Sequence, residues 1–295
     1  MLKILERFFS EKIYACGIRI LDQPSDCFVF EKKPFQILFP TQKEWYADSF
    51  CIHENNATFL FVEIMGRNGK KGSIGVSRYY PEEGFSKVTE VLREDFHLSY
   101  PNIFRYKDKY YMIPETYQAH QIRLYEAEEF PFKWNLCKVL LDDSNAYVDS
   151  SFLPISPCIF LLYTYDINNS RPSWFEFDLE KMSLEKVSWI GQVAQERPGG
   201  NAININGKHY RVLQDCSHVY GEKLKLYRID EFDYSCKRYS ETFVGEVSTE
   251  MINTKSRVHF ERIHTLSVSD NVQAVDLLFT RYSIFLPVKK NDPKS

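Results

Sequence analysis

An internal repeat of about 50 residues constrains the fold of this chain more than any other feature of its sequence. In each copy a short apolar strand is followed by a polar turn, a second apolar strand and an acidic residue, as in 45–63 and 98–115. Neighbouring copies lie 52, 49, 48 and 67 residues apart. The five copies align on Asp48, Tyr100, Asp149, Arg197 and His264. A repeat of this length is typical of one four-stranded propeller blade, so the sequence predicts an all-β, five-bladed β-propeller.

The second half of each copy supplies further strands, in which apolar residues alternate with polar ones. The segments 72–78 and 224–229 are examples of this pattern, which is typical of strands with one buried face. No linker rich in proline, glycine or serine divides the chain. We therefore expect residues 1–295 to form a single domain.

Within that domain we expect the propeller to span residues 35–286. A strand at 35–39 is predicted to close the ring against the last blade, because closure removes an exposed sheet edge. Residues 1–34 are predicted to form a short N-terminal helix and edge strands outside the ring. The polar residues 287–295 are predicted to form a flexible tail.

Charge and cysteine content narrow the functional classes. A net charge of -3 and a pI near 6.2 argue against nucleic acid as a partner, because non-specific binding to it requires a basic field. No apolar run approaches the roughly 18 residues of a transmembrane helix, and the first residues lack the pattern of a signal peptide. The seven cysteines form no CxxC pair and no zinc spacing, which is typical of reduced cysteines. We expect a cytoplasmic protein with no metal and no cofactor.

The residues on which the five copies align should meet at the centre of the molecule. The innermost strand of each propeller blade lines the central channel, so equivalent positions of the repeat converge on one axis. Two acids, a phenol, a guanidinium and an imidazole are costly to bury without partners, which favours a functional funnel over a packed core. The alternative interpretation is local: Asp-Ser at 48 and 149 could form Asx turns, and Tyr-Pro at 100 could be a rigid entry to a strand.

A second set of acids ends the second strand of the first four copies. Each of them could line the wall of the site, or could support it by pairing with Arg197, His97 or backbone donors. Glu115 is the one expected to face the funnel. The set consists of Glu63, Glu115, Asp166 and Asp215.

Two carboxylates across a pocket are the groups that glycosidic-bond chemistry requires, one as an acid and the other as a base or nucleophile. The residues predicted to be catalytic are Asp48, Asp149 and Glu115. The residues predicted to bind substrate are Arg197, Tyr100, His97, His264, Glu63, Asp215 and Trp45.

Six motifs also resemble a known family. They are Trp-Tyr-Ala-Asp-Ser-Phe at 45–50, His-Leu-Ser-Tyr-Pro at 97–101, Tyr-Met-Ile-Pro-Glu-Thr at 111–116, Arg-Pro-Gly-Gly-Asn at 197–201, Gln-Asp-Cys-Ser-His-Val-Tyr-Gly at 214–221 and His-Thr-Leu-Ser-Val at 264–268. The chain thereby resembles the N-terminal propeller domain of plant glucosamine inositolphosphorylceramide transferases and of bacterial surface-polysaccharide proteins. That family is distantly similar to the five-bladed glycoside hydrolases of families 32, 43 and 62.

The resemblance implies roles for two acids and also a departure. It implies that Asp48 matches the base or nucleophile of the hydrolases, and that Asp149 matches the Asp that tunes the pKa of their acid. In blade four, where the hydrolases have an acidic Glu, this chain has Arg197, with Glu196 beside it. This departure argues against hydrolysis.

Three functions remain open from the sequence. The first is a cytosolic glycosyltransferase of surface-glycan biosynthesis, with a sugar or sugar nucleotide and a glycan acceptor as partners and with a peripheral contact to membrane-bound glycan machinery. Arg197 suits this reading because a guanidinium binds phosphates and anionic sugars well. The second is a glycoside hydrolase. The third is a non-catalytic sugar-binding module, since a fold does not fix a function.

Overall fold

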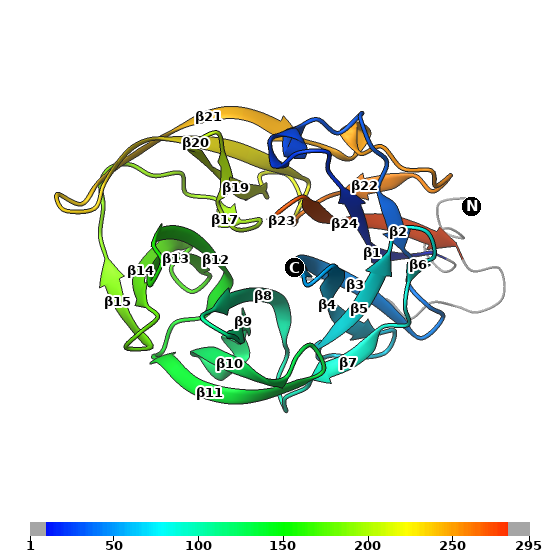
Figure 1. Ribbon diagram of the computed structural model, residues 1–295, viewed down its shortest axis with the longest axis horizontal. Helices are drawn as coiled ribbons and strands as arrows, with labels where there is room; N and C mark the ends of the chain where they lie inside the picture. Colours follow the sequence, from blue (N-terminus) through cyan, green and yellow to red (C-terminus); the bar gives the residue numbers. More distant parts are fainter. Residues whose placement is uncertain (1–9, 283–295) are drawn as a thin grey trace.

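The computed structural model describes residues 10–282, which form five blades of mainly antiparallel strands around a central axis (Figure 1). The prediction of an all-β, five-bladed propeller is confirmed. The expected helix at the N-terminus and the expected tail at 287–295 lie outside the described residues. Three 3-10 turns accompany the strands: η1 (Pro24–Phe28), η2 (Tyr117–Ala119) and η3 (Thr249–Met251). Among the described residues, no helix is long and apolar enough to cross a membrane.

The first three blades follow the repeat directly, with the innermost strand first in the chain (Figure 1). Blade one contains β3 (Glu44–Glu54), β4 (Ala57–Gly66), β5 (Ser73–Tyr80), β6 (Gly84–Phe85) and β7 (Thr89–Leu92). Blade two contains β8 (Ser99–Tyr106), β9 (Lys109–Glu115), β10 (Gln121–Glu129) and β11 (Lys133–Asp142). Blade three contains β12 (Tyr147–Ser156), β13 (Ile159–Asp166), β14 (Arg171–Asp178) and β15 (Ser183–Val187).

The last two blades are less regular, because their innermost strands are split in two. Blade four contains β17 (Arg197–Pro198), β18 (Ile203–Ile205), β19 (Lys208–Asp215), β20 (Lys223–Asp233), β21 (Arg238–Val247) and, parallel to β21, β16 (Ile190–Gln192). Blade five contains β22 (Phe260–Arg262), β23 (Leu266–Ser269), β24 (Val272–Tyr282), β1 (Ser10–Ile20) and β2 (Gln36–Leu38).

Strand β1 closes the ring. It pairs with β24 along its whole length, from Ser10 opposite Tyr282 to Ile20 opposite Val272. The prediction that this segment forms edge strands outside the ring is therefore wrong for β1, while the strand predicted at 35–39 does join the last blade, as its outer strand β2 paired with β1. The reason is burial: Ile13 and Ala15 pack towards blade four, while Cys16 and Ile18 pack towards blade one.

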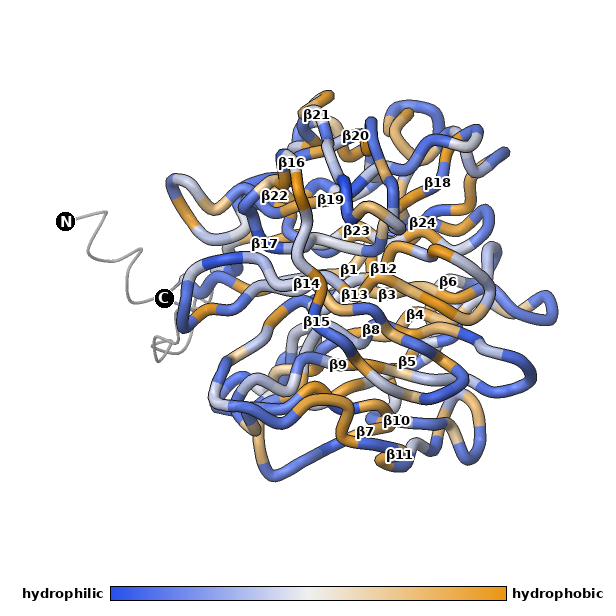
Figure 2. The backbone as a smooth tube through the Cα atoms, turned by 90° about the vertical axis from the view of Figure 1, so that its left-hand side faces the viewer, coloured by the Kyte–Doolittle hydropathy of each residue, from blue (hydrophilic) through white to orange (hydrophobic). Residues whose placement is uncertain are grey.

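Apolar packing between neighbouring blades holds the ring together. Each of the five large clusters of buried apolar side chains joins two blades: Val212 of blade four meets Val275 of blade five, and Phe104 of blade two meets Phe152 of blade three. Figure 2 shows apolar segments along the strands and hydrophilic ones at the connecting turns. The channel is therefore set in a rigid wall of sheets.

Candidate functional site in the central channel

The innermost strand of each blade is interrupted at the same place. The pairing register shifts between Ala47 and Phe50 on β3, between Ser99 and Asn102 on β8, and between Val148 and Ser151 on β12. In blades four and five the interruption is the gap between β17 and β18 and the gap between β22 and β23. A bulge of this kind redirects a side chain away from the regular pleat.

The first three interruptions carry three of the residues on which the repeat aligns. Asp48, Tyr100 and Asp149 adopt φ values of 51°, 49° and 55°, in the left-handed region that non-glycine residues rarely enter. Such a conformation costs about 1–3 kcal/mol and persists where the surrounding structure imposes it, often at functional sites. All three residues are buried.

Asp48 belongs to a chain of carboxylate, imidazole and carboxylate that joins blades one and five. The Nε2 atom of His264 lies 3.1 Å from Asp48 Oδ1, and its Nδ1 atom lies 2.6 Å from Asp276 Oδ2. Asp276 also accepts hydrogen bonds from three backbone amides, those of Asp48, His264 and Thr265. We call Asp48, His264 and Asp276 the Asp48 cluster.

Aromatic rings enclose the imidazole of the Asp48 cluster. Tyr14 of the closing strand stacks on His264 with ring centroids 4.8 Å apart, and Tyr220 approaches it edge-on at 5.4 Å. Burial is the largest single influence on the pKa of His264 and lowers it, but Asp276, Tyr14 and Tyr220 together outweigh burial, so the pKa lies well above its ordinary value. The imidazole is therefore a cation between two carboxylates.

Asp149 forms a second cluster, between blades three and four. Arg197 donates to Asp149 Oδ2 through Nε at 2.7 Å and Nη2 at 2.5 Å, and Gln214 donates to the same oxygen at 3.0 Å. The backbone amide of Asp149 donates to Glu115 Oε2 at 3.3 Å. We call Asp149, Arg197, Gln214 and Glu115 the Asp149 cluster.

The guanidinium of the Asp149 cluster is also backed by an aromatic ring. Arg197 lies over the ring of Tyr220 at 5.0 Å. Burial is the largest single influence on the pKa of Arg197 and lowers it, but Asp149, Tyr220 and Glu115 together outweigh burial and hold that pKa well above its usual range. Because Tyr220 contacts both Arg197 and His264, it bridges the cations of the two clusters.

Tyr100 connects the clusters on the side of blade two. Its backbone amide donates to Asp48 Oδ2 at 3.2 Å, and its hydroxyl lies 2.7 Å from the hydroxyl of Ser151. Burial, followed by the nearby Asp149 carboxylate, raises the pKa of Tyr100 well above its ordinary value. The phenol therefore keeps its proton.

Glu63 and His97 form a pair at the junction of blades one and two. His97 Nε2 lies 3.4 Å from Glu63 Oε1, and Nδ1 accepts a hydrogen bond from the amide of Gly72 at 2.8 Å. A Cβ atom on Gly72 would lie 2.5 Å from the carbonyl oxygen of Leu98, so only glycine fits beside this pair. The geometry corresponds to the supporting role considered for Glu63.

Three predicted residues have mainly structural contacts. Asp166 accepts hydrogen bonds from the amides of Asn168 and Asn169 and so caps the turn after β13. Asp215 caps the next such turn, accepting from the amide and the hydroxyl of Ser217. Trp45 packs against Tyr14, with ring centroids 5.7 Å apart, in the apolar layer behind His264.

Sequence reasoning did not assign two residues that the structure brings into the clusters. Asp276 ends the fifth copy of the repeat, at the position that Glu63 and Glu115 hold in the first two copies, so the repeat carried its signal. Gln214 begins the motif at 214–221 and reaches Asp149 from the strand next to Arg197.

The Asp48 cluster is the group of described residues whose ligand atoms could surround a metal ion, since these atoms lie within 4.8 Å of one another. A histidine that binds a metal must be neutral and must direct a lone pair at the ion. Here each ring nitrogen faces a carboxylate oxygen at hydrogen-bond distance. The donor set fits a protonated imidazole, which already supplies the cation.

The fold and the channel define a five-bladed propeller of the class found in arabinofuranosidases. The catalytic domain of a Coprinopsis cinerea α-L-arabinofuranosidase matches with a TM-score of 0.59 and 9% identity, over 92% of this chain and 98% of that one. The Podospora anserina α-L-arabinofuranosidase in complex with cellotriose matches with a TM-score of 0.57 and 11% identity, over 81% of this chain and 91% of that one. At these identities the likeness concerns the fold.

The family is more specific than the fold. The family described as "Glucosamine inositolphosphorylceramide transferase 1, N-terminal" matches residues 36–276, and this chain belongs to it. The glucosamine inositolphosphorylceramide transferase 1 of Oryza sativa subsp. japonica is 33% identical over 197 residues, 63% of this chain and 26% of the relative. The Arabidopsis thaliana protein of that name is 28% identical over 195 residues, 62% of this chain and 25% of the relative. The chain thus spans about a quarter of these relatives.

Proposed function

We propose that the channel binds a sugar and that the chain is a carbohydrate-active protein of surface-glycan biosynthesis, acting in glycosyl transfer. The observation that carries this proposal is the pairing of Asp149 with Arg197, which puts a permanent cation at the blade-four position of the channel. The name shared by the relatives, a glucosamine inositolphosphorylceramide transferase, supports the same class of reaction.

The chemistry of the two clusters favours transfer over hydrolysis. Glycoside hydrolysis needs a protonated acid to assist the leaving oxygen of an alkyl glycoside. Transfer from a sugar phosphate or sugar nucleotide does not, because a phosphate leaves as a stable anion. It needs a cation beside that phosphate and a base for the acceptor hydroxyl. Arg197 is such a cation, and Asp48 is such a base.

The proposed roles divide the three acids that were predicted to be catalytic. Asp48 takes the proton of the acceptor hydroxyl as its oxygen attacks the anomeric carbon and the bond to the donor phosphate breaks. Asp149 orients Arg197 towards the departing phosphate, because Nε and Nη2 face Asp149 and Nη1 lies off that fork. Glu115 fixes the backbone of Asp149.

The cytosol remains part of this proposal. All seven cysteines lie in the described part of the chain and none forms a disulfide, which suits a reducing compartment. A sugar nucleotide and a glycan acceptor are the proposed partners, with a peripheral contact to the membrane-bound machinery that carries the acceptor.

A non-catalytic sugar-binding domain is the second candidate. It is favoured by the deep burial of both clusters, in which Asp48 and Asp149 are each 2% exposed. It is also favoured by length, since the three quarters of the relatives that lie outside the match leave room for chemistry elsewhere.

The test follows sugar nucleotides and glycan fragments by saturation-transfer NMR over time, with wild type, Asp48→Asn and Arg197→Lys. We expect Asp48→Asn to retain donor binding and to lose at least about 100-fold in turnover, the usual contribution of a general base. Arg197→Lys should weaken donor binding, because a lysine cannot form the planar fork. The matched control is Glu196→Gln, whose carboxylate faces Lys225 and Tyr227 on blade four and should leave both readouts unchanged.

The other outcomes also decide between functions. Glycan binding without turnover in the wild type would leave a recognition domain. Release of free sugar would make the chain a hydrolase, and the absence of any sugar binding would overturn the proposal.

A further inference from the structure

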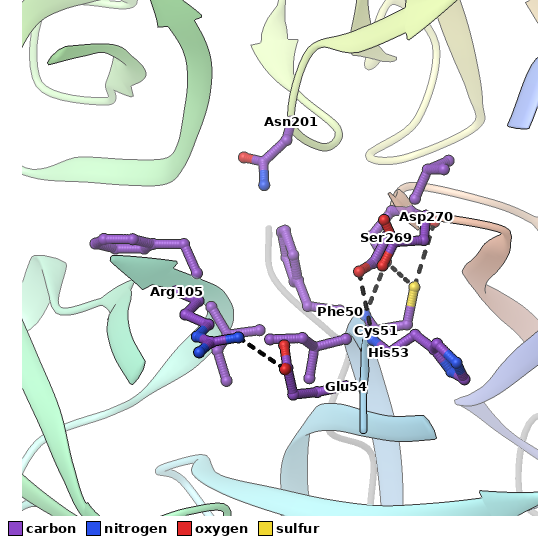
Figure 3. Close-up of a pocket in the computed structure, with 13 residues that line it drawn as sticks. Phe50, Cys51, His53, Glu54, Arg105, Asn201, Ser269 and Asp270 are labelled. Atoms are coloured by element: carbon purple, nitrogen blue, oxygen red, sulfur yellow. Dashed lines mark hydrogen bonds and ion pairs between the residues drawn. The ribbon is translucent and has the colours of Figure 1, made fainter. Parts of the chain in front are cut away.

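A polar cavity lies beyond the interruptions of the innermost strands. Its volume is about 250 Å³, and we call it the distal chamber (Figure 3). It is lined by the ends of β3, β8 and β23 and by one residue of blade four: Phe50, Cys51, Ile52, His53, Glu54, Ile103, Phe104, Arg105, Asn201, Ser267, Val268, Ser269 and Asp270. The lining residues on β3 come after Asp48 in the chain. No residue of the Asp48 cluster or the Asp149 cluster lines the distal chamber, so it is a separate compartment.

Asn201 lines the distal chamber, and the buried side chain of Asn102 holds it in place. Asn102 Nδ2 donates to Asn201 Oδ1 at 2.7 Å, and Asn201 Nδ2 donates back to Asn102 Oδ1 at 2.9 Å. The amide of Phe152 donates to Asn201 Oδ1 at 2.8 Å. These bonds fix which end of the Asn201 amide is the donor, and an NH2 group has two protons, one of which is used here. Figure 3 shows Asn201 pointing into the chamber.

In the opposite wall, two serine hydroxyls of β23 accept hydrogen bonds from backbone amides of β3. Ser267 Oγ accepts the amide of Cys51 at 3.1 Å, and Ser269 Oγ accepts the amide of His53 at 3.4 Å. Ser267 Oγ also donates to Cys51 Sγ at 3.6 Å, whereas the Ser269 hydroxyl, which accepts one hydrogen bond, still has a proton to donate. The chamber therefore presents hydroxyl and amide groups on rigid strands.

The charges at the rim largely cancel. Arg105 Nη1 lies 2.8 Å from Glu54 Oε1, as the dashed line in Figure 3 shows. The remaining acid, Asp270, disfavours an anion. The side chains of Phe50, Ile103 and Phe104 also line the chamber but are almost wholly buried, so its exposed lining is mainly polar.

We propose that the distal chamber is a second binding site, for an uncharged polyhydroxyl compound of monosaccharide size. Its volume is just below the range of about 300–1,000 Å³ that holds drug-sized ligands, so the ligand is small. Amide and hydroxyl groups held on neighbouring strands are the complement of the hydroxyl groups of a small polyhydroxyl compound. This site does not depend on the reaction proposed for the two clusters.

The experiment separates the two compartments with variants on each side. Glucose, galactose, mannose and myo-inositol serve as probes, with glucuronate as the charged comparison, and binding is measured by saturation-transfer NMR titration. Ser269→Trp fills the chamber from the end of β23 and should weaken binding of the neutral probes by at least about tenfold. Asp48→Asn should leave this binding unchanged. Glucuronate should bind more weakly than glucose.

A second variant tests the proposal in case Ser269→Trp fails to fold. Arg105→Ala removes the rim pair from β8, on the surface, and should weaken binding by about threefold with little change in stability. Thermal unfolding of each variant checks the fold. Binding that survives both Ser269→Trp and Arg105→Ala, binding that is lost in Asp48→Asn alone, or no binding of any neutral probe would each overturn the proposal.

Discussion

The two clusters in the channel bury the same group, an aspartate, with cations of different chemistry. Asp149 is paired with Arg197, which carries its charge at any pH that a protein tolerates. Asp48 is paired with His264, whose charge depends on a proton held between two carboxylates. Both aspartates lie on the same kind of bulge in equivalent strands, so the clusters differ in the groups around the aspartate and not in its backbone.

Because of this difference, only the Asp48 cluster can change its charge by gaining or losing a proton. The Asp149 cluster is fixed in charge and suits the holding of a substrate group. The Asp48 cluster can gain or lose one proton, which a group involved in proton transfer must be able to do. The experiments below change one cluster at a time.

The largest effect is expected from Arg197→Met. It leaves the Asp149 carboxylate buried without its cation, so the free energy of unfolding should fall by about 3 kcal/mol. The control is Lys12→Met, which breaks the exposed pair of Lys12 with Glu261 and should cost less than about 1 kcal/mol. Denaturant unfolding measures both variants. Equal losses in the two variants would show that Asp149 does not depend on Arg197, and the comparison would fail.

A smaller effect is expected from crowding His264. Gly221 has a φ of +60°, and a Cβ atom on it would lie 2.6 Å from His264 Cβ. Gly207 has a φ of +80° but open space around it, so Gly207→Ala controls for backbone strain alone. We expect Gly221→Ala to lower the free energy of unfolding by about 2 kcal/mol more than Gly207→Ala, because overpacking adds to the strain. Equal losses of unfolding free energy in the two variants would mean that His264 can move away from the added methyl group without destabilising the protein.

The smallest effect on the free energy of unfolding is expected from a change of one pH unit. The folded-state pKa of His264 is raised, so its stabilising contribution is complete below the unfolded-state pKa of about 6.5 and is lost as the pH rises through the folded-state pKa. Above pH 6.5 the free energy of unfolding should fall by up to about 1.4 kcal/mol per pH unit. His264→Gln should remove this slope. Parallel pH curves for wild type and His264→Gln would place the titration elsewhere.

The repeat predicted the blades and their innermost strands well, because equivalent backbone positions recur in the sequence. Asp48, Tyr100 and Asp149 were aligned by spacing alone, and the structure gives all three the same left-handed backbone. The pattern could not show where each side chain turns after the bulge. Asp215 and Asp276 end corresponding copies of the repeat, yet Asp215 caps a turn and Asp276, within β24, binds His264.

Ring closure could not be predicted from local signals. Residues 10–20 and 35–39 are both apolar segments before the first blade, and each could pair with the last one. Which of them lies against β24 depends on burial between blades four and one. The contacts of β1 with these blades join residues that are far apart in the sequence, such as Ile13 and Val212, and they follow no regular spacing. Contacts of this kind leave no mark in a short stretch of sequence.

The pairing of β1 with β24 has a consequence for how such a ring can be built into larger assemblies. Ser10 and Tyr282 are direct neighbours at one end of the blade, so the described part of the chain begins and ends at one point of the ring. A domain with adjoining ends can be inserted into a surface loop of another protein without distorting its host. The same geometry means that tension applied to both ends would separate the strands one residue pair at a time, starting at Ser10 and Tyr282.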